Sequence, residues 1–354
     1  MKPRVLFHVY NISGYLIAEL EELSKVAEIT VIYTPYEQEY AESAYPRYRW
    51  IRRPDVKDAQ QVIDLLGDER SDVFFCGGWA DREMVRLAGV LRRRGTKTVL
   101  LVDTPWQGKL KQVLHCLYSR FYLTTRFDFA WCAGAAQERY LRYLGFPLKR
   151  IRRGYYCADT KKFAPIGANK VKVTGEGEQR MWPHVFLYVG RYVAVKNMRR
   201  MERAFIKAIE TMPESDWTLR CIGGGSLWDE RTVHPRIEHL GYRQPKEIQN
   251  YVKGAGCFVL PSVYEPWGVV VHEAALMGLP MLCSKLVQAT TAYLKEGENG
   301  FSFDPMDEEA MTAAFLKIMR TLDTELAKFG QESARLGLQY TTADWAERAK
   351  EFAK

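Results

Sequence analysis

The sequence predicts an α/β protein made of two doubly wound domains, each with a largely parallel sheet. Three observations support this prediction: the length of 354 residues, an alternation of short apolar runs with amphipathic stretches, and a central segment rich in glycine, proline and charge. A chain of this length exceeds a comfortable single core, so two domains are expected. The alternation is typical of strand–helix–strand units, in which helical crossovers connect parallel strands.

The first domain is expected over residues 1–165. Its predicted strands are the apolar runs at 4–10, 28–33, 72–78, 97–103 and 128–134, and an amphipathic helix over about 15–25 follows the first of them. Residues 166–183 have the glycine, proline and charge content of a linker.

The second domain is expected over residues 184–340. Its predicted strands lie at 184–190, 217–225, 236–241, 256–262 and 279–284. Residues from about 340 to 354 predict one more amphipathic helix, which we expect to pack back on the first domain. Two domains of this kind would face each other across a cleft, with the carboxyl ends of both sheets toward a shared ligand.

Composition indicates a soluble globular protein, with 47% apolar and 27% charged residues. The seven cysteines are never closer than 16 positions, which excludes CxxC zinc and redox motifs and favours a reducing cytoplasm. No apolar run approaches the ~18 residues that a membrane-spanning helix needs. We therefore expect a cytoplasmic protein that is not integral to a membrane.

The positive charge is concentrated in the first half of the chain. Residues 1–165 contain 27 lysines and arginines against 19 acidic residues, whereas residues 166–354 contain 24 of each. This imbalance suggests an anionic membrane surface or an acidic acceptor near the first domain, with peripheral association at the inner membrane face. Solvated helix faces are the alternative explanation, and nucleic acid is not expected because no recognisable binding module accompanies the charge.

The segment 264–280, YEPWGVVVHEAALMGLP, contains two glutamates eight positions apart. Glu265 precedes a proline and is expected in a loop, whereas Glu273 falls inside a short helix that ends before Gly278. Because a helix N-terminus attracts anions, a nucleotide sugar could lie along this helix with its phosphates at the amino end. The alternative is an ordinary core helix with Glu265 as a cap and Glu273 on a solvated face.

A second candidate segment follows the first strand of the second domain. Gly190 ends that strand, Arg191 comes next, and Lys196 lies five residues later, before a predicted helix. Two cations at such a strand end could neutralise a diphosphate. Taken alone, they could also be ordinary residues of a surface loop.

These segments together resemble the retaining glycosyltransferases of family 4. The resemblance rests on Gly190-Arg191 with Lys196, on CIGGGSL, on HLGYRQPKEIQNYVKGAGCFVLPS, on EPWGVVVHEAALMGLP and on ENGFSFDP, in this order across residues 184–305. It implies the GT-B architecture, with two Rossmann-like domains and a nucleotide-sugar donor held mainly by the second.

The resemblance also implies roles for individual residues. Arg191 and Lys196 would hold the donor diphosphate and act in catalysis, Glu265 would meet the donor sugar, and Glu273 would bind the ribose diol. The remaining donor contacts are expected, largely through backbone, from Gly190, Gly241, Tyr242, Arg243, Trp267, Gly268 and Val269.

The first domain resembles the family less closely. Gly14 stands where the family has a glycine-containing loop near the donor phosphates. Many members place a histidine after a mid-domain strand, where this chain has Asp103 and Trp106; His115 is expected on the following helix. Asp103 is therefore our candidate for the acceptor side, with an ordinary turn residue as the alternative.

The resulting hypothesis is a retaining glycosyltransferase of the hexosyltransferase type, acting on a glycan or lipid-linked acceptor. The chain contains no D-x-D pair, so we expect neither a metal nor another cofactor beyond the donor substrate. A GT-B sugar-nucleotide epimerase and a catalytically silent nucleotide-sugar binding protein are the alternatives.

Overall fold

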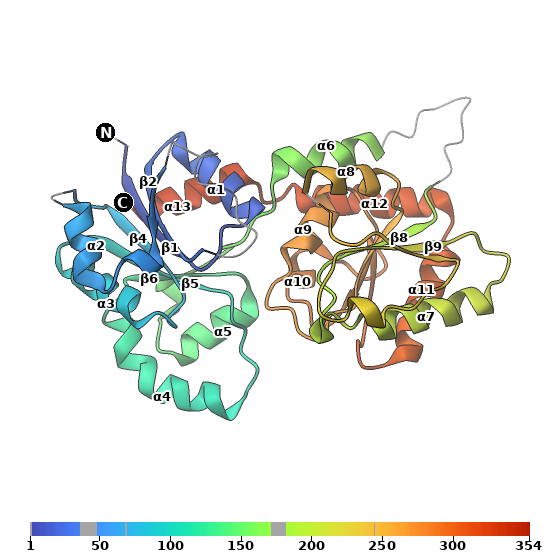
Figure 1. Cartoon of the computed structure of the whole chain (residues 1–354), viewed down its shortest axis with the longest axis horizontal. Helices are drawn as coiled ribbons and strands as arrows, with labels where there is room; N and C mark the ends of the chain where they lie inside the picture. Colours follow the sequence, from blue (N-terminus) through green and yellow to red (C-terminus); the bar gives the residue numbers. More distant parts are fainter. Residues whose placement is uncertain (1, 36–47, 68, 171–181, 244) are drawn as a thin grey trace. The chain divides into compact units, whose positions relative to one another are not determined.

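The computed structural model describes residues 2–35, 48–67, 69–170, 182–243 and 245–354 of the chain. It divides into two compact units, the first formed by residues 1–159 and 341–354 and the second by residues 160–340 (Figure 1). Each unit has a parallel sheet with helices around it, as expected.

Among its described residues, the first unit has a sheet of seven strands in the order β3-β2-β1-β4-β5-β6-β7. The strands are β1 (Arg4–Val9), β2 (Glu28–Tyr33), β3 (Arg49–Arg52), β4 (Val73–Gly77), β5 (Lys97–Val102), β6 (Phe129–Cys132) and β7 (Ile151–Arg153). The helices are α1 (Gly14–Ser24), α2 (Ala59–Leu66), α3 (Arg82–Arg93), α4 (Leu110–Thr124), α5 (Ala135–Tyr143) and α13 (Thr342–Glu351), with short 3₁₀ turns η2 (Arg53–Asp55) and η3 (Leu148–Arg150). The central strands are continuous buried apolar runs, as expected for a sheet covered on both faces.

In the part of the second unit that the structure describes, six strands form a sheet in the order β10-β9-β8-β11-β12-β13. The strands are β8 (Val185–Val189), β9 (Thr218–Ile222), β10 (Ile237–His239), β11 (Cys257–Leu260), β12 (Met281–Ser284) and β13 (Gly300–Phe303). The helices are α6 (Thr160–Lys170), α7 (Met198–Thr211), α8 (Pro245–Lys253), α9 (Val269–Leu276), α10 (Thr290–Tyr293), α11 (Glu308–Met319) and α12 (Asp323–Gly337), with 3₁₀ turns η4 (Ala194–Lys196) and η5 (Trp228–Glu230).

The strand order reverses once in each sheet, between β1 and β4 in the first unit and between β8 and β11 in the second. All pairings in both sheets are parallel, so the carboxyl ends of the strands share one edge. In open α/β sheets, ligands bind outside the carboxyl ends at such a reversal. Ligands are therefore expected near the loops after β1, β4, β8 and β11.

The boundary between the units lies between Asp159 and Thr160, whereas we expected the first domain to end at 165. Helix α6 packs against α9 and α12 of the second unit, with Phe163 and Ile166 buried. A Cβ on Gly167 would lie 2.1 Å from the carbonyl oxygen of Leu276, so this glycine permits close helix contact. Of the expected linker 166–183, residues 166–170 are thus the end of a packed helix, and residues 171–181 lie outside the described residues.

The last helix, α13, belongs to the first unit and packs against α1. It begins with a capping box in which the Thr341 hydroxyl and the Asp344 carboxylate each accept from the other's backbone N–H. Trp345 is fully buried beside Trp131, with ring centroids 5.0 Å apart, and its indole N–H donates to the carbonyl of Tyr155 at 2.6 Å.

Candidate functional site

An ion pair spans the strand-order reversal of the second sheet. The Lys196 ammonium, at the end of η4 after β8, contacts the carboxylate of Glu265 in the loop after β11. The two side chains are only 14% and 16% exposed, and Ser262 Oγ donates to the same carboxylate at 3.3 Å. The fold thus joins two residues 69 positions apart that the sequence analysis had assigned to one ligand.

The loop that carries Lys196 is held to its neighbours through Asn197, which the sequence analysis did not identify. Asn197 is the sole non-glycine residue with positive φ in the described part of the chain, at 56°. Its side-chain amide donates to the carbonyls of Pro261 at 3.2 Å and Pro305 at 2.8 Å. Asparagine tolerates this left-handed conformation better than most residues, so it can both turn the chain into α7 and fix the preceding lysine.

Gly190 and Arg191 lie at the end of β8, on the same edge of the sheet. The Gly190 N–H donates to Ile222 at 3.0 Å, and the buried Tyr188 hydroxyl donates to the Arg191 carbonyl at 3.0 Å. Because burial raises the pKa of Tyr188 well above its usual value, this phenol stays protonated and is a constant donor. The exposed Arg191 guanidinium therefore extends from a fixed backbone.

Three strand ends meet closely through glycines at this edge. The Gly223 N–H donates to the carbonyl of Gly241 at 2.9 Å, which ties the end of β9 to the segment after β10. A Cβ on Gly223 would lie 1.9 Å from the Gly190 carbonyl oxygen, and its φ of 142° is also unfavourable for other residues. The glycines of CIGGGSL therefore permit backbone contact at this edge. Tyr242 is exposed and Arg243 half-buried beside Gly241.

Helix α9 begins next to Glu265, as predicted. Its N-cap residue is Gly268, with φ 98°, and Val269 is the first helical residue. Trp267 is buried, and its carbonyl accepts from Ala289 N at 2.9 Å, which fixes the approach to the helix. Glu273 lies four residues after Val269, hence on the same helix face and about 6 Å further along the axis.

A polar pair supports the loop after β9. Tyr192 is buried, its hydroxyl lies 2.9 Å from His239 Nδ1, and its ring packs on Trp228 at 5.1 Å. The other His239 nitrogen, Nε2, lies 2.9 Å from the Thr232 carbonyl and donates to it, because a carbonyl oxygen can only accept. The Tyr192 N–H donates to the Gly224 carbonyl at 2.9 Å, so the Tyr192–His239 pair stabilises the glycine-rich turn.

Asp103 and the two neighbours of Gly14, Ser13 and Tyr15, line a cavity of the first unit. It has a volume of about 260 Å³ and lies at the β1/β4 reversal. The Tyr156 hydroxyl donates to Asp103 Oδ2 at 3.3 Å, and burial raises the pKa of this phenol well above its usual value.

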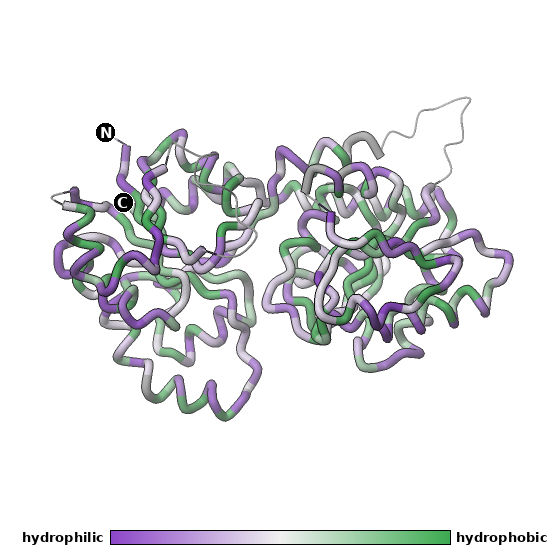
Figure 2. The backbone as a smooth tube through the Cα atoms, viewed as in Figure 1, coloured by the Kyte–Doolittle hydropathy of each residue, from purple (hydrophilic) through white to green (hydrophobic). Residues whose placement is uncertain are grey.

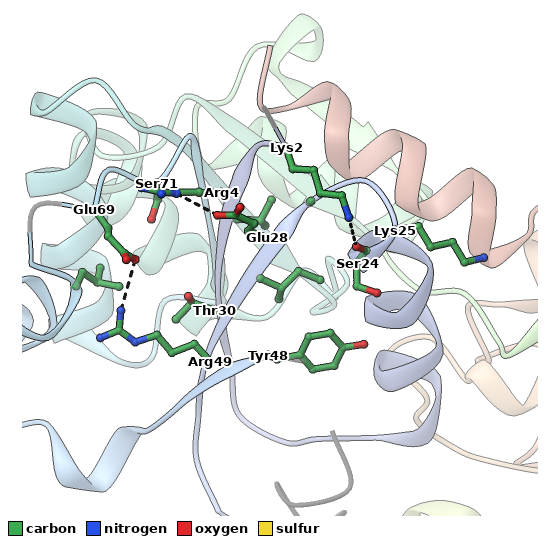
Figure 3. Close-up of a pocket in the computed structure, with 14 residues that line it drawn as sticks. Lys2, Arg4, Ser24, Lys25, Glu28, Thr30, Tyr48, Arg49, Glu69 and Ser71 are labelled. Carbon is green, nitrogen blue, oxygen red and sulfur yellow. Dashed lines mark hydrogen bonds and ion pairs between the residues drawn. The ribbon is translucent and has the colours of Figure 1, made fainter. Parts of the chain in front are cut away.

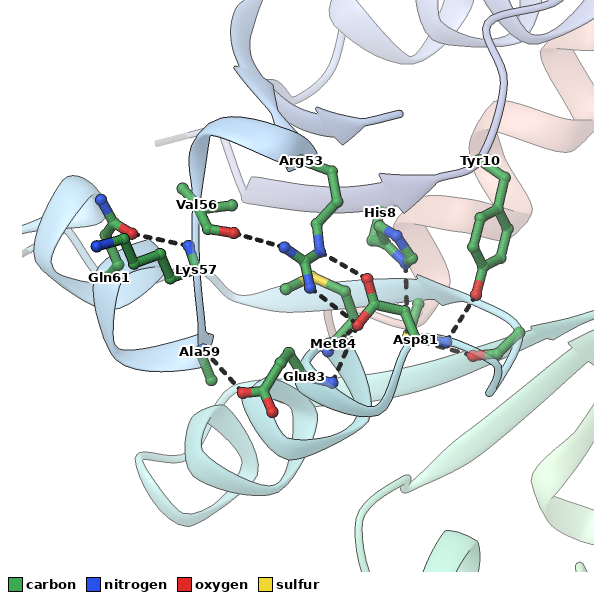
Figure 4. A network of polar contacts seen from close by, with 12 residues as sticks. His8, Tyr10, Arg53, Val56, Lys57, Ala59, Gln61, Asp81, Glu83 and Met84 are labelled. Carbon is green, nitrogen blue, oxygen red and sulfur yellow. Dashed lines mark hydrogen bonds and ion pairs between the residues drawn. The ribbon is translucent and has the colours of Figure 1, made fainter. Parts of the chain in front are cut away.

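A partly buried polar network adjoins this cavity through Tyr10, which is one of the lining residues (Figure 4). The Tyr10 hydroxyl accepts from Asp81 N at 2.9 Å, and Asp81 caps helix α3 and pairs with Arg53 at 2.6 Å. Burial opposes ionisation of Asp81, but the Arg53 guanidinium outweighs it and the pKa lies below its usual value. His8 is fully buried in the same network, and burial lowers its pKa to about 4.

His115 lies on α4, as expected, and not beside Asp103. Its Nδ1 is 3.0 Å from the Tyr140 hydroxyl, and its ring stacks on Trp79 with centroids 5.2 Å apart. Burial lowers the pKa of His115. These contacts are those of a packed helix residue.

A larger cavity of about 570 Å³ lies at the opposite, amino-terminal edge of the first sheet (Figure 3). Two of its cations are already paired with carboxylates, Arg4 with Glu28 at 3.1 Å and Arg49 with Glu69 at 3.5 Å. Ligands of such sheets bind at the carboxyl ends of the strands, so this cavity is not a candidate for the functional site.

Comparison with known proteins matches residues 183–321 to the family model described as "Glycosyl transferases group 1". Among curated relatives, the O-antigen chain mannosyltransferase B of Escherichia coli is 28% identical over 149 residues, which cover 40% of this chain and 38% of the relative. The UDP-Gal:alpha-D-GlcNAc-diphosphoundecaprenol alpha-1,3-galactosyltransferase of Escherichia coli is 28% identical over 171 residues, with 45% and 43% covered. The matched segments thus span less than half the length of these relatives.

The fold has a match over nearly its full length. The crystal structure of Anabaena HepE in complex with UDP has a TM-score of 0.73 at 13% identity and covers 99% of both chains. At this level of identity the likeness establishes the fold, which is GT-B. Residues 183–321, the segment that contains Lys196, Glu265 and helix α9, are similar to the family described as glycosyl transferases group 1.

Proposed function

We propose that this protein is a retaining glycosyltransferase that moves a sugar from a nucleoside diphosphate sugar to a glycan or lipid-linked acceptor, without a divalent metal. The observation that carries the proposal is the Lys196–Glu265 pair at the β8/β11 reversal, next to Arg191 and the N-terminus of α9. Cations and a helix N-terminus suit a diphosphate, and carboxylates suit sugar hydroxyls.

In the proposed reaction, the bond between the anomeric carbon and the diphosphate oxygen breaks, and its electron pair leaves with the nucleoside diphosphate. The acceptor oxygen forms the new bond to the same carbon on the face from which the diphosphate leaves, which retains the configuration, and its proton passes to the departing phosphate oxygen. The negative charge that builds on the leaving phosphate is stabilised by Arg191, Lys196 and the dipole of α9. Preorganised charges of this kind act mainly on the transition state.

Lys196 can serve this role while it stays paired with Glu265. An ammonium group has three N–H donors, so one can hold the carboxylate while another reaches a phosphate oxygen. The pair would also orient the Glu265 carboxylate toward the donor sugar. We propose that Glu273, about one helical turn after Val269 on α9, binds the ribose diol.

On the acceptor side we propose Asp103, which lines the cavity at the β1/β4 reversal with the loop that contains Gly14. The Tyr156 hydroxyl would orient its carboxylate. The base of the donor is recognised mainly by backbone near Gly241, Tyr242 and Arg243, which leaves few side chains that specify it. We further propose action in the cytoplasm, at the inner membrane face; none of the helices in the described part of the chain has the length and apolar character to cross a bilayer.

Incubation with UDP-, GDP- and ADP-sugars, followed by product analysis, tests the proposal. A donor at about 100 times its dissociation constant should stabilise the protein by about 2.7 kcal/mol, which identifies the base by thermal shift. Transfer with retained anomeric configuration, undiminished in excess EDTA, is the expected outcome. Epimerised donor without transfer would identify the epimerase, and binding without hydrolysis or transfer would identify a silent binding protein. Loss of turnover in EDTA, with rescue by magnesium or manganese, would contradict the metal-free mechanism.

A further inference from the structure

Helix α4 of the first unit has its apolar residues on the outside. Leu110, Leu114, Leu117 and Phe121 follow the i, i+4, i+7, i+11 spacing of a single helix face, and they are 73%, 57%, 73% and 75% exposed. On an ordinary surface helix the stripe with this spacing is the one that packs on the core. Here that stripe faces solvent.

The inward face of α4 combines polar and apolar residues. Ser119 and Leu123 are buried there, and His115, Cys116 and Tyr122 are half-buried. The helix is therefore anchored to the unit by one side while an apolar stripe remains uncovered on the other. A contiguous exposed apolar surface of this kind commonly marks an interaction site.

The charges near this stripe are all of one sign. Between Asp103 and Asp128 the sequence contains Lys109, Lys111, Arg120 and Arg126 and not one acidic residue. At 100° per residue, Lys111 and Arg120 fall on opposite flanks of the apolar stripe, and both are exposed. Figure 2 shows the resulting alternation of hydrophobic and hydrophilic residues along α4.

Two more exposed hydrophobic side chains and one more cation lie beside α4. Tyr143, at the end of α5, is 50% exposed and packs on Trp106 with centroids 4.6 Å apart, and Leu148 after it is also exposed. Arg120 reaches the turn after α5, since a Cβ on Gly145 would lie 2.7 Å from its side chain. Lys149 adds an exposed cation next to Leu148. We call α4 together with the 143–149 turn the α4 surface.

We infer that the α4 surface docks the protein on an anionic lipid bilayer, with α4 parallel to the membrane plane. Leu110, Leu114, Leu117 and Phe121 would enter the boundary between headgroups and acyl chains, while Lys109, Lys111 and Arg120 contact anionic headgroups. A helix of 15 residues is about 22 Å long and too short to span the hydrocarbon core, so an interfacial position is the one that buries the stripe.

The absence of carboxylates from residues 104–127 favours lipid over a second copy of this chain or a protein partner. A self-complementary interface would bring like charges together, which costs energy, whereas an anionic leaflet attracts every cation on the surface. The inference specifies the membrane part of the proposed function. It is tested by binding alone, so its failure would leave sugar transfer unaffected.

Co-sedimentation with vesicles tests the inference on the full chain without donor or acceptor. Vesicles of phosphatidylcholine with about 30% phosphatidylglycerol should bind the protein, pure phosphatidylcholine should bind it weakly, and binding to the anionic vesicles should fall as salt rises. The double variant Lys109→Glu/Lys111→Glu should weaken binding by about 30-fold or more, at roughly 1 kcal/mol for each cation lost from the surface.

A second double variant, Leu117→Ser/Phe121→Ser, should weaken binding by about tenfold or more through loss of apolar insertion. Both variants change exposed side chains, so each should keep the wild-type unfolding midpoint. Two controls are matched to them: Lys57→Glu/Lys253→Glu makes the same charge change elsewhere, and Val233→Ser removes an apolar side chain that is 89% exposed in the second unit. Neither control should change vesicle binding.

Other outcomes would overturn the inference. Equal binding of wild type to neutral and anionic vesicles would show that the cations do not contribute to binding. Unchanged binding of the Leu117→Ser/Phe121→Ser variant would show that α4 does not insert. If that variant instead dissociated a dimer detected by analytical ultracentrifugation and vesicle binding was absent, the α4 surface would be a protein interface.

Discussion

Lys196 Nζ and Glu265 form an ion pair between the loops that follow β8 and β11, the two strands at which the second sheet reverses its order. A mostly buried pair of this kind constrains both loops, because neither charge can lose its partner without a desolvation cost. The same pair is the centre of the proposed donor site. It therefore links the stability of the second unit to its function.

The first prediction concerns the coupling within this pair. Lys196→Met should destabilise the protein by about 1 to 3 kcal/mol, because the Glu265 carboxylate is left partly buried without its cation. The double variant with Glu265→Gln should lose clearly less than the sum of the single variants, with a coupling energy of about 0.5 to 3 kcal/mol. Urea unfolding of the four proteins measures this cycle. Strictly additive losses would mean that the contact contributes nothing.

Turnover should respond to the two cations of the site. Lys196→Ala should lower the rate by about 10² to 10³, the usual loss when one preorganised donor is removed. Arg191→Lys should also be damaging, because a planar fork is replaced by a point charge. Lys207→Ala is the matched control, since this lysine lies on α7 and pairs with Glu308 and Glu309 away from the strand ends. A rate for Lys196→Ala close to that of the control would reject the assignment.

Glu273 should contribute to donor affinity. If its carboxylate binds the ribose diol, Glu273→Ala should weaken donor binding by on the order of 1.5 to 3 kcal/mol, the range for hydrogen bonds to charged groups. Calorimetry with the donor identified by the nucleotide screen measures the loss. Glu309→Ala, at an exposed glutamate of α11, should bind the donor as wild type does. A folded Glu273→Ala protein with full affinity would disprove this role.

Gly268 should not tolerate a side chain. Its φ is 98°, and a Cβ would lie 3.0 Å from Glu265 Cγ and 3.2 Å from Val287 Cγ1. Gly268→Ala should therefore combine about 1 to 3 kcal/mol of backbone strain with displacement of Glu265. Gly297→Ala separates the two effects, because Gly297 has φ 75° with nothing within 4 Å of the added Cβ. Both variants should lose stability in urea, but only Gly268→Ala should also lose donor binding.

The protein should become less stable as the pH falls, in part through His272. This histidine is buried, its Nε2 donates to the Gly337 carbonyl at 2.8 Å, and burial lowers its pKa to about 4. Below pH 6.5 the unfolded chain takes up a proton that the folded protein refuses until about pH 4, so stability is present above 6.5 and is lost across this window.

The comparison that isolates this effect is with His272→Gln, which keeps a donor but does not titrate. Wild type should be the more stable protein at pH 7, and the difference between the two should shrink by on the order of 1 kcal/mol or more by pH 5. Urea unfolding at pH 7, 6 and 5 measures it. A difference that stays constant over this range would mean that His272 does not titrate as burial predicts. Other titrating groups are common to both proteins and cancel.

The sequence by itself determined the fold class and most of the second unit. Continuous apolar runs predicted the central strands of both sheets, because these strands are buried on both faces. Pro266 and Gly278 bounded helix α9 through local backbone preferences, and the helix lies at Val269–Leu276. The sequence did not identify β3, β7 and β13 as strands; they are short, and β3 and β7 are largely exposed edge strands with little apolar character.

Only the tertiary structure decided which distant residues meet. Spacing along the chain cannot show that Lys196 contacts Glu265, because strand order and not sequence order makes β8 and β11 neighbours. Asn197 was missed because its role depends on carbonyls at 261 and 305. The end of helix α6, residues 166–170, was assigned to the linker because Pro165 and Gly167 are local breaking signals, whereas the packing of this helix on α9 is a long-range contact. The outward apolar stripe of α4 was hidden for the same reason: periodicity identifies an apolar face, but the surrounding elements decide whether that face is covered.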